Sequence, residues 1–300
     1  MRLFLSKIAL MIVGILLLLG AILMIDRTLL EHSNIFVLDK NVHLLILGDS
    51  RTKYGLNDKI LENACNLSND ADSYFYSYLK LKTVTKNNNQ ITTLLLSFSQ
   101  HNIEKSVETQ WLLEKTHINQ RLKIYYVLFD IKDFLFLIKQ KPAEVISNLF
   151  PQILYPIKLL KGRNIYGGFA DMDHNVLKEE IVKYKKKTDS QDIKFTESSI
   201  ERAYLEKIKD LCKTNGIELI FINTPLHKIL IDKQEHLYVF YKKHFSDVPF
   251  LDFSRLDLPD SYFSDLVHLS PEGSNYFSHL LEDKGIINLA NEATLNSASK

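Results

Sequence analysis

The sequence predicts an α/β protein in which a central parallel sheet is covered by helices on both faces, a three-layer αβα sandwich, behind one N-terminal transmembrane helix. Short, continuously apolar runs alternate with helix-like stretches along the chain. Crossovers between parallel strands place helices on both faces of a sheet, so this alternation favours that arrangement. A chain of 300 residues is long enough to bury one large core.

The membrane segment is residues 8–25 (IALMIVGILLLLGAILMI), which contain no charged residue. As a helix these 18 residues rise about 27 Å, close to the roughly 30 Å of a bilayer's hydrocarbon core. Arg2 and Lys7 precede the run, which predicts that residues 1–7 are cytoplasmic and that the rest of the chain is outside. The run is longer than that of a cleavable signal peptide and no small-x-small site follows, so we expect an uncleaved anchor.

Residues 26–41 form a spacer before the first predicted strand. Buried strands of a parallel sheet are short apolar runs bounded by turn residues. The runs of this kind are residues 42–47 (VHLLIL), 64–68 (ACNLS), 92–98 (TTLLLSF), 217–222 (IELIFI) and 249–253 (PFLDF).

Helices are expected between these strands and after the last one. The helix-like stretches are residues 57–63, 73–86 and 200–213, and a stretch that ends near Gly285. Asn215-Gly216 predicts the end of the third helix, because glycine is favoured just past a helix C-terminus. Ser270 as N-cap and Pro271 as the first helical residue predict the start of the fourth.

A helical insertion is expected at about residues 103–200, inside an α/β domain that covers residues 42–288. The insertion contains longer helical segments, such as residues 124–140, and a loop-like region at residues 161–173. Residues 289–300 are polar and predict a frayed tail.

Composition excludes several classes of function. The 37 Lys and Arg residues nearly balance 36 Asp and Glu, and no basic stripe interleaved with aromatics occurs, so nucleic-acid binding is not expected. Cys65 and Cys212 are too far apart in sequence for a zinc knuckle or a CxxC redox pair. They are either two buried thiols or one disulfide. We expect no metal and no cofactor.

The first candidate for chemistry is Gly48-Asp49-Ser50, directly after the first predicted strand. Reactive groups in open α/β sheets lie at the carboxyl ends of strands, which is where a nucleophilic Ser50 belongs. Free backbone N–H groups of a helix that starts there would favour an oxyanion. The structural alternative is that Ser50 is an ordinary N-cap.

The second candidate is Asp265-x-x-His268, just before the last predicted helix. In that loop the Asp265 carboxylate can hold one imidazole nitrogen while the other faces Ser50, the arrangement of a general base. The alternative for an isolated D-x-x-H is a solvated turn. The position after the last strand, on the same sheet edge as Ser50, favours the catalytic interpretation.

The two motifs, GDS and D-x-x-H-L-S-P-E-G, resemble the first and last blocks of the SGNH-hydrolase (GDSL esterase and acyltransferase) superfamily. The resemblance covers about residues 42–102 and 205–285 and implies a flavodoxin-like sandwich. It also implies that Ser50 is the nucleophile, His268 the base and Asp265 the residue that orients it.

The family's second and third blocks supply oxyanion donors. In the second block Ser68 stands where glycine is usual, and its backbone N–H is the expected donor. In the third block the asparagine has two candidates, His101 and Asn102, of which Asn102 is the expected donor. His101 and Arg51 are further candidates for substrate contact, although Arg51 is also compatible with an exposed arginine paired to a nearby acid.

The anchor, the insertion and the motifs together resemble bacterial envelope members of the superfamily. The resemblance implies a single-pass protein of the bacterial inner membrane with a periplasmic catalytic domain. We expect a serine esterase or O-acyltransferase acting on acyl esters of a cell-envelope polysaccharide or related polymer, with a possible membrane partner protein that supplies acyl groups. The alternative is a catalytically inactive SGNH-like binding or assembly module. The sequence leaves hydrolase and transferase equally open.

Overall fold

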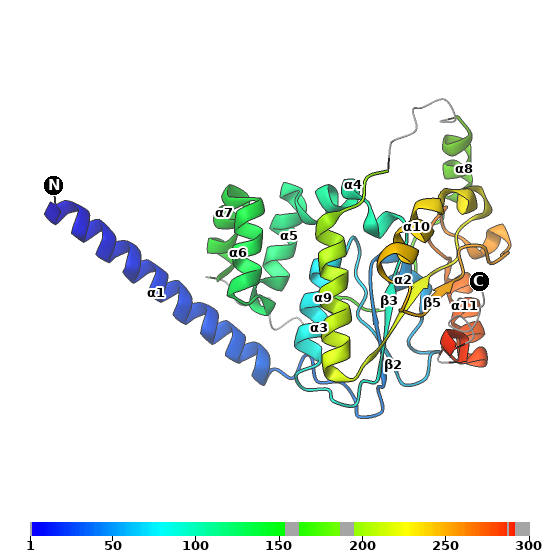
Figure 1. The fold of residues 1–300 in the computed structure, drawn as a ribbon, viewed down its shortest axis with the longest axis horizontal. Coiled ribbons are helices and arrows are strands. Elements are labelled where there is room, and N and C mark those ends of the chain that lie inside the picture. The colour runs from blue at the N-terminus through cyan, green and yellow to red at the C-terminus, as the bar shows by residue number, and fades with distance from the viewer. Residues whose placement is uncertain (1, 154–161, 187–194, 287, 292–300) are drawn as a thin grey trace. The chain divides into compact units, whose positions relative to one another are not determined.

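The computed structural model describes residues 2–153, 162–186, 195–286 and 288–291. The chain forms two compact units (Figure 1). The anchor-cap unit contains Met1–Val37 and Leu113–Ile165, and the sheet unit contains Leu38–Leu112 and Tyr166–Lys300. Of the predicted polar tail, residues 292–300 lie outside the described residues.

The described part of the sheet unit contains a five-stranded, all-parallel sheet in the order β2-β1-β3-β4-β5. Every strand overlaps one of the predicted apolar runs, which confirms the α/β class. The strands are β1 Leu44–Leu47, β2 Ala64–Asn66, β3 Thr93–Ser97, β4 Glu218–Asn223 and β5 Phe250–Asp252.

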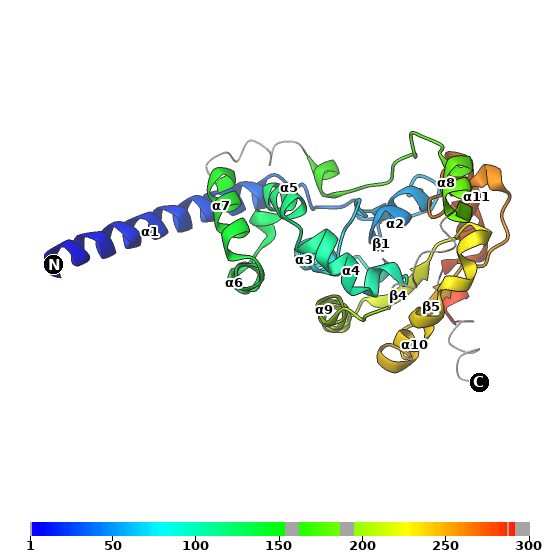
Figure 2. The same cartoon turned by 90° about the horizontal axis from the view of Figure 1, so that it is seen from above.

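Helices flank this sheet (Figure 2). On one face, Ile46 and Ile220 of the strands join Phe277 of α11 in a buried apolar cluster. On the other face, Phe221 stacks on Phe98, which also contacts Phe240 of α10. The flanking helices are α2 Ser50–Gly55, α3 Tyr74–Val84, α9 Ser199–Asn215, α10 Glu235–His244 and α11 Pro271–Lys284.

Two predicted helices differ from the structure. Residues 57–63 are not helical, because the helix of this crossover, α2, starts directly after β1 and ends at Gly55. The Asn57 side chain then accepts the Lys59 amide in a turn. The predicted helix at residues 124–140 is broken: Asp130 starts a new helix, since its carboxylate accepts the amides of the next turn in a capping box.

Other helix ends are as predicted. Ser270 accepts the Gly273 amide as N-cap of α11, with Pro271 in the first turn. Gly216, at φ 68°, ends α9 in the left-handed conformation. Cys65 and Cys212 are both buried and neither is in a disulfide, which decides between the two alternatives for the cysteines in favour of two thiols.

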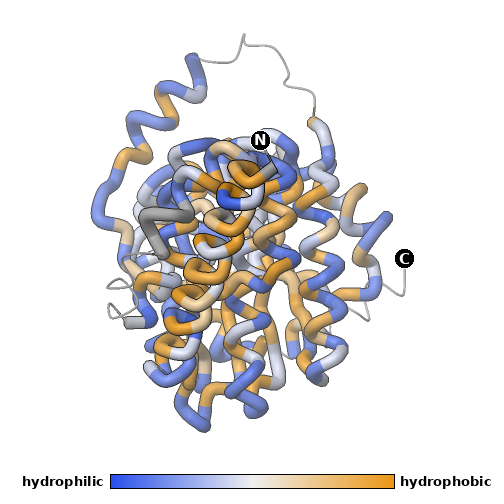
Figure 3. Tube along the Cα trace, turned by 90° about the vertical axis from the view of Figure 1, so that its left-hand side faces the viewer, coloured by the Kyte–Doolittle hydropathy of each residue, from blue (hydrophilic) through white to orange (hydrophobic). Residues whose placement is uncertain are grey.

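The anchor-cap unit consists of α1 Arg2–His32 and a helical cap, here the described residues 113–153 and 162–165. By length and composition α1 could span a membrane, and its mean hydropathy reaches 3.1. Figure 3 colours the trace by hydropathy, seen with the N-terminal end of the chain toward the viewer. The cap contains α5 Lys115–Tyr125, η3 Tyr126–Leu128, α6 Ile131–Gln140 and α7 Pro142–Ile153.

The remaining short elements belong mainly to the sheet unit. They are η1 His101–Ile103, α4 Lys105–Val107, η2 Glu108–Leu112, η5 Arg163–Tyr166, α8 Leu177–Lys186, η6 Lys228–Lys233 and η7 Asp260–Tyr262. Of these, α8 bears on the candidate site described next, because Glu180 lies on it.

Candidate active site

The turn after β1 depends on Gly48. Its φ of +151° is unfavourable for residues with a side chain, and a Cβ at this position would lie 2.3 Å from Cβ of Ser97 on β3. Glycine therefore lets the chain leave β1 close to β3. Asp49 and Ser50 follow at the carboxyl edge of the sheet.

Asp49, and not Ser50, is the N-cap of α2. Its Oδ1 accepts the Arg51 amide at 3.0 Å, while Ser50 is the first helical residue. The alternative that Ser50 serves as an N-cap is therefore wrong. The Ser50 hydroxyl is left to bond elsewhere.

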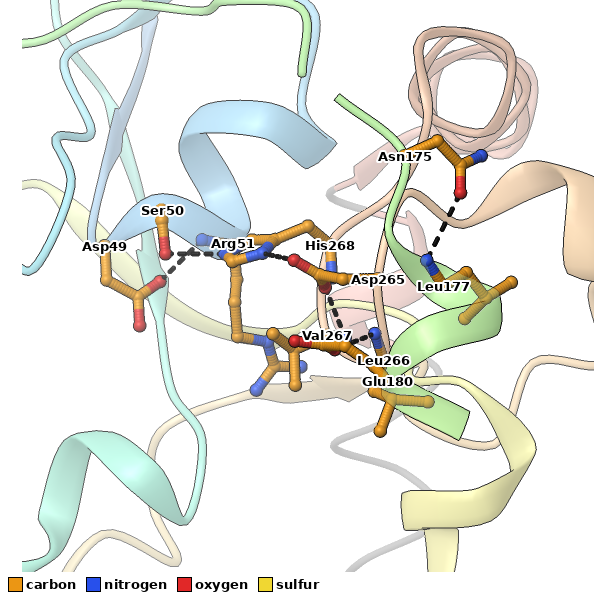
Figure 4. A network of polar contacts seen from close by, with 10 residues as sticks. All are labelled: Asp49, Ser50, Arg51, Asn175, Leu177, Glu180, Asp265, Leu266, Val267 and His268. Carbon is orange, nitrogen blue, oxygen red and sulfur yellow. Dashed lines mark hydrogen bonds and ion pairs between the residues drawn. The ribbon is translucent and has the colours of Figure 1, made fainter. Parts of the chain in front are cut away.

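Ser50, His268 and Asp265 form a continuous hydrogen-bonded chain (Figure 4). Ser50 Oγ lies 2.7 Å from His268 Nε2. His268 Nδ1 lies 2.7 Å from Asp265 Oδ2. The structure thus brings together the three residues that the two motifs predicted.

The turn that carries Asp265 is held by its own backbone. Asp265 Oδ1 accepts the amides of Val267 at 2.8 Å and His268 at 2.7 Å. Ser264 N–H donates to the His268 carbonyl at 3.0 Å. Burial alone would raise the pKa of Asp265, but the bonds from the His268 ring and from these amides hold it below its usual value. The carboxylate therefore stays ionised beside His268.

Two further residues contact this turn, and the sequence motifs did not indicate either. Glu180 on α8 accepts the Leu266 amide through Oε2 at 3.1 Å (Figure 4). The Tyr54 ring packs edge-on against the His268 ring, with centroids 5.5 Å apart. Tyr54 could be suspected from its place four residues after Ser50 on the same helix. Glu180 has no such local signal.

Part of the predicted insertion runs past the candidate site as an extended strap, residues 167–176. Gly168 N–H donates to the Ser68 carbonyl at 3.0 Å, and Ala170 N–H to the Lys53 carbonyl at 3.3 Å. Val176 N–H donates to the Ser264 carbonyl at 2.8 Å. The strap therefore links the loop around Ser68, the helix α2 that begins at Ser50, and the turn that carries Asp265.

The buried Lys80 stabilises the loop that contains Ser68. Its ammonium pairs with Asp72 at 2.5 Å, and neither side chain is exposed. It also donates to the carbonyls of Leu67 and Tyr166, the residues before Ser68 and before the strap. A buried charge is tolerated here because it is paired and hydrogen-bonded.

The expected oxyanion donors are hydrogen-bonded within the protein. Ser68 N–H donates to Asn66 Oδ1 at 2.8 Å. Asn102 Nδ2 donates to Asp49 Oδ2 at 2.8 Å, which leaves its second N–H for another acceptor. Within the described residues, the Ser50 amide donates no hydrogen bond. The Ser50 amide and the second Asn102 N–H are thus the donors that remain.

Arg51 does not reach the site. Its guanidinium points away from Ser50 (Figure 4) and donates to Asn223 Oδ1 at 2.7 Å and to the Thr224 carbonyl at 2.8 Å. The residue is only 7% exposed. The description as an exposed arginine paired to an acid is wrong, because its acceptors are an amide and a carbonyl of the β4 end. This geometry gives no support to a substrate contact.

His101 is exposed and begins η1, which follows β3. Its ring packs edge-on against Trp111, with centroids 4.6 Å apart. Desolvation lowers the pKa of His101, the Asp49 charge opposes this, and the charges of Arg51 and His268 lower it further. Substrate contact by His101 stays a prediction.

No cluster of three or more His, Cys, Asp or Glu residues that could hold a metal occurs in the part of the chain that the structure describes.

Comparisons with known proteins add one finding. A protein-family profile without a functional description matches residues 173–290, the segment with Glu180, Asp265 and His268. No curated protein is significantly similar to the chain.

Proposed function

We propose that the protein is a serine esterase or O-acyltransferase of the SGNH type, with Ser50 as nucleophile, His268 as base and Asp265 as its orienting carboxylate. The observation that carries the proposal is the unbroken path of two 2.7 Å contacts from Ser50 Oγ through His268 to Asp265. A serine hydroxyl is a weak nucleophile unless such a base takes its proton.

In the proposed reaction, Ser50 Oγ attacks the carbonyl carbon of an acyl ester and His268 Nε2 takes the hydroxyl proton. Asp265 stabilises the imidazolium that results. The C–O bond to the leaving alcohol then breaks, the proton passes from His268 to that alcohol, and the acyl group stays on Ser50. Water or a polymer hydroxyl, whose proton His268 takes, finally attacks the acyl carbon, the bond from that carbon to Ser50 Oγ breaks, and His268 returns the proton to Ser50 Oγ.

The oxyanion is the charge that such a reaction must stabilise. The Ser50 amide and the second N–H of Asn102 are the donors we assign to it. Each donor of this kind is worth about 10² to 10³ in rate. The Ser68 amide would have to leave Asn66 before it could contribute.

The strand order supports the finer fold proposal, a three-layer SGNH-like sandwich. An order of β2-β1-β3-β4-β5 is that of flavodoxin-like sheets, whose topological switch point lies between β1 and β3. Ligands of such sheets bind outside the carboxyl ends of the strands at this point. Ser50 follows β1 and Asn102 follows β3.

The proposed location is the bacterial inner membrane, with α1 as a single span and the catalytic domain in the periplasm. The apolar composition of α1 and the cations before it support this. The proposed substrates are acyl esters of a cell-envelope polysaccharide or related polymer. A membrane partner protein would supply acyl groups if the protein is a transferase.

The second candidate function is an SGNH-like binding or assembly module without activity. It is favoured by the internal bonding of the expected oxyanion donors, Ser68 N–H to Asn66 and Asn102 Nδ2 to Asp49. A protein with an intact triad but few oxyanion donors would bind an acyl ester and turn it over slowly or not at all.

A fluorophosphonate probe separates the two functions, because it reacts with an activated serine without requiring the natural substrate. The full chain in detergent is treated with the probe beside Ser50→Ala, and intact mass is measured. One adduct on the wild type and none on Ser50→Ala would support the enzyme. A folded wild type without an adduct would favour the binding module.

A further inference from the structure

The helical cap packs against α1. The least exposed positions of α1 include Leu19 and Leu23, which are partly buried, and Asp26 and Leu30, which are buried. Their spacing of three and four residues places them on one face of the helix. The elements of the cap that contact α1 are α7 and η3.

A buried hydrogen bond fixes this contact. Tyr126 of η3 donates its hydroxyl to Asp26 Oδ2 at 2.8 Å, and Asp26 is only 1% exposed. Asp26 directly follows the apolar run of residues 8–25. The cap is therefore anchored at the point where the run ends.

Two of the partly buried positions, Leu19 and Leu23, belong to the apolar run itself. From Leu19 to Ile25 an α-helix rises about 9 Å. If residues 8–25 occupy the hydrocarbon core, the partly buried Leu19 and Leu23 lie within about that distance of its outer boundary. Amphipathic helices that lie in a membrane interface are buried to about 5–10 Å, the same depth.

The surface of the cap has the composition that this position requires. Ile131 is 75% and Leu135 59% exposed, one helical turn apart on α6, and Ile146 on α7 is 56% exposed. Lys132 and Lys139, both exposed, also lie on α6. Apolar side chains beside lysines match a boundary between acyl chains and anionic headgroups.

We propose that the cap is a membrane-interface module, in which Ile131, Leu135 and Ile146 lie among the lipids next to α1. The occupant of this apolar surface is the bilayer, because the cap is joined at Asp26 to the end of a helix that is itself long and apolar enough to span it. The inference rests on α1 being the span and goes beyond the proposed chemistry of Ser50.

Lipid-borne quenching tests the proposal. The full chain is reconstituted in vesicles of phosphatidylcholine with a minority of phosphatidylglycerol, and Leu135→Cys or Ile146→Cys is labelled with an environment-sensitive fluorophore. Leu10→Cys reports on the span, and Val239→Cys, at a 60% exposed position of α10 in the other unit, is the matched soluble control. The wild type, whose two cysteines are buried, gives the labelling background.

We expect the labels at positions 135 and 146 to lose about half of their fluorescence when a nitroxide is placed on the acyl chains near the headgroup. The label at position 239 should respond only to aqueous iodide. Quenching of the positions 135 and 146 by iodide alone, or by neither quencher, would overturn the proposal in favour of a solvent-exposed or protein-covered surface. A label at position 10 that lipid does not quench would overturn the span together with the cap, and would leave Ser50 untested by this experiment.

Discussion

Ser50 Oγ and His268 Nε2 lie 2.7 Å apart although 218 positions separate the two residues in the chain. The contact is possible because α2, which begins at Ser50, packs against α11, which begins just after His268. The Asn57 amide, just past α2, donates to Ser278 Oγ of α11 at 2.9 Å and helps to fix that packing. The contact between Ser50 and His268 therefore depends on the packing of α2 against α11.

Asp265→Asn should nearly abolish reaction with the fluorophosphonate while leaving the fold intact. An amide NH₂ group opposite Nδ1 would favour the imidazole tautomer that presents a hydrogen, and not a lone pair, to Ser50. The rate constant for labelling should fall by a factor on the order of 10³ to 10⁴. Stopped-time intact mass measures this rate, and circular dichroism checks the fold.

The same variant has a second expected effect, on stability in acid. The pKa of Asp265 is lowered in the fold, so its carboxylate stabilises the protein above the ordinary pKa of about 4. That stabilisation is lost as the pH falls through the lower pKa of the folded state. Asp265→Asn should therefore lose less stability than the wild type in denaturant titrations carried from pH 5 down through that range. If the stability of the two proteins fell equally with pH, the hydrogen bonds from His268 and Val267 would not stabilise the ionised carboxylate of Asp265.

Glu180→Ala should slow labelling of Ser50 by about tenfold. The Leu266 amide, in the turn that carries Asp265 and His268, loses its acceptor, so the turn is less well positioned. Glu180→Gln keeps an acceptor oxygen and should label at nearly the wild-type rate. Glu179→Ala changes the exposed neighbour on α8 and serves as the control. Equal rates in all four proteins would remove Glu180 as a positioning residue.

Asn102→Ala should separate an oxyanion role from a structural one when it is compared with Ser97→Ala. Each variant removes one hydrogen bond to the buried carboxylate of Asp49, and each should cost about 1–3 kcal/mol in stability. Only Asn102→Ala should also slow labelling, by about 10². If the two variants label equally fast, Asn102 only supports Asp49.

Glu201 on α9 predicts how stability changes at neutral pH. Burial raises its pKa to about 8, helped by the charges of Glu108 and Asp72 and opposed by the Tyr74 amide. The Glu201 carboxyl group is therefore protonated in the folded protein at neutral pH. Its contribution to the free energy of unfolding is fully present below pH 4.5 and is lost as the pH rises to about 8.

In the wild type, this group should make the free energy of unfolding fall by up to about 1.4 kcal/mol per pH unit across that window. Glu201→Gln should flatten the dependence. Glu206→Gln, on the same helix with a 57% exposed side chain, is the control. Denaturant titrations at several pH values measure the slope, and an equally steep slope in Glu201→Gln would contradict the protonated state.

The strands could be predicted because buried parallel strands leave a simple signal, a continuous apolar run such as that of β3, which is buried throughout. A helix that starts at Ser50 was considered, but its 6 residues leave too short a pattern to set its end, and its cap, Asp49, was interpreted as part of a catalytic motif. The break before α6 did leave a signal, the D-x-x-D of its capping box at Asp130 and Asp133.

The site was predictable where chemistry is local to a motif and not where it depends on distant contacts. Asp265 and His268 are close in sequence, so their pairing follows from spacing. Glu180 accepts a hydrogen bond from the Leu266 amide, 86 positions away in the chain. Because nearly every residue has a backbone amide, the sequence does not indicate which amide a given carboxylate contacts. The burial of Arg51 likewise depends on acceptors that β4 provides far along the chain.

The central claim is that His268 activates Ser50, and the rate of phosphonylation of Ser50 in the wild type and in His268→Ala tests it most directly. The account predicts a single adduct on Ser50 in the wild type and a rate constant lower by a factor on the order of 10³ or more in a folded His268→Ala protein. A His268→Ala protein that labels as fast as the wild type would contradict it.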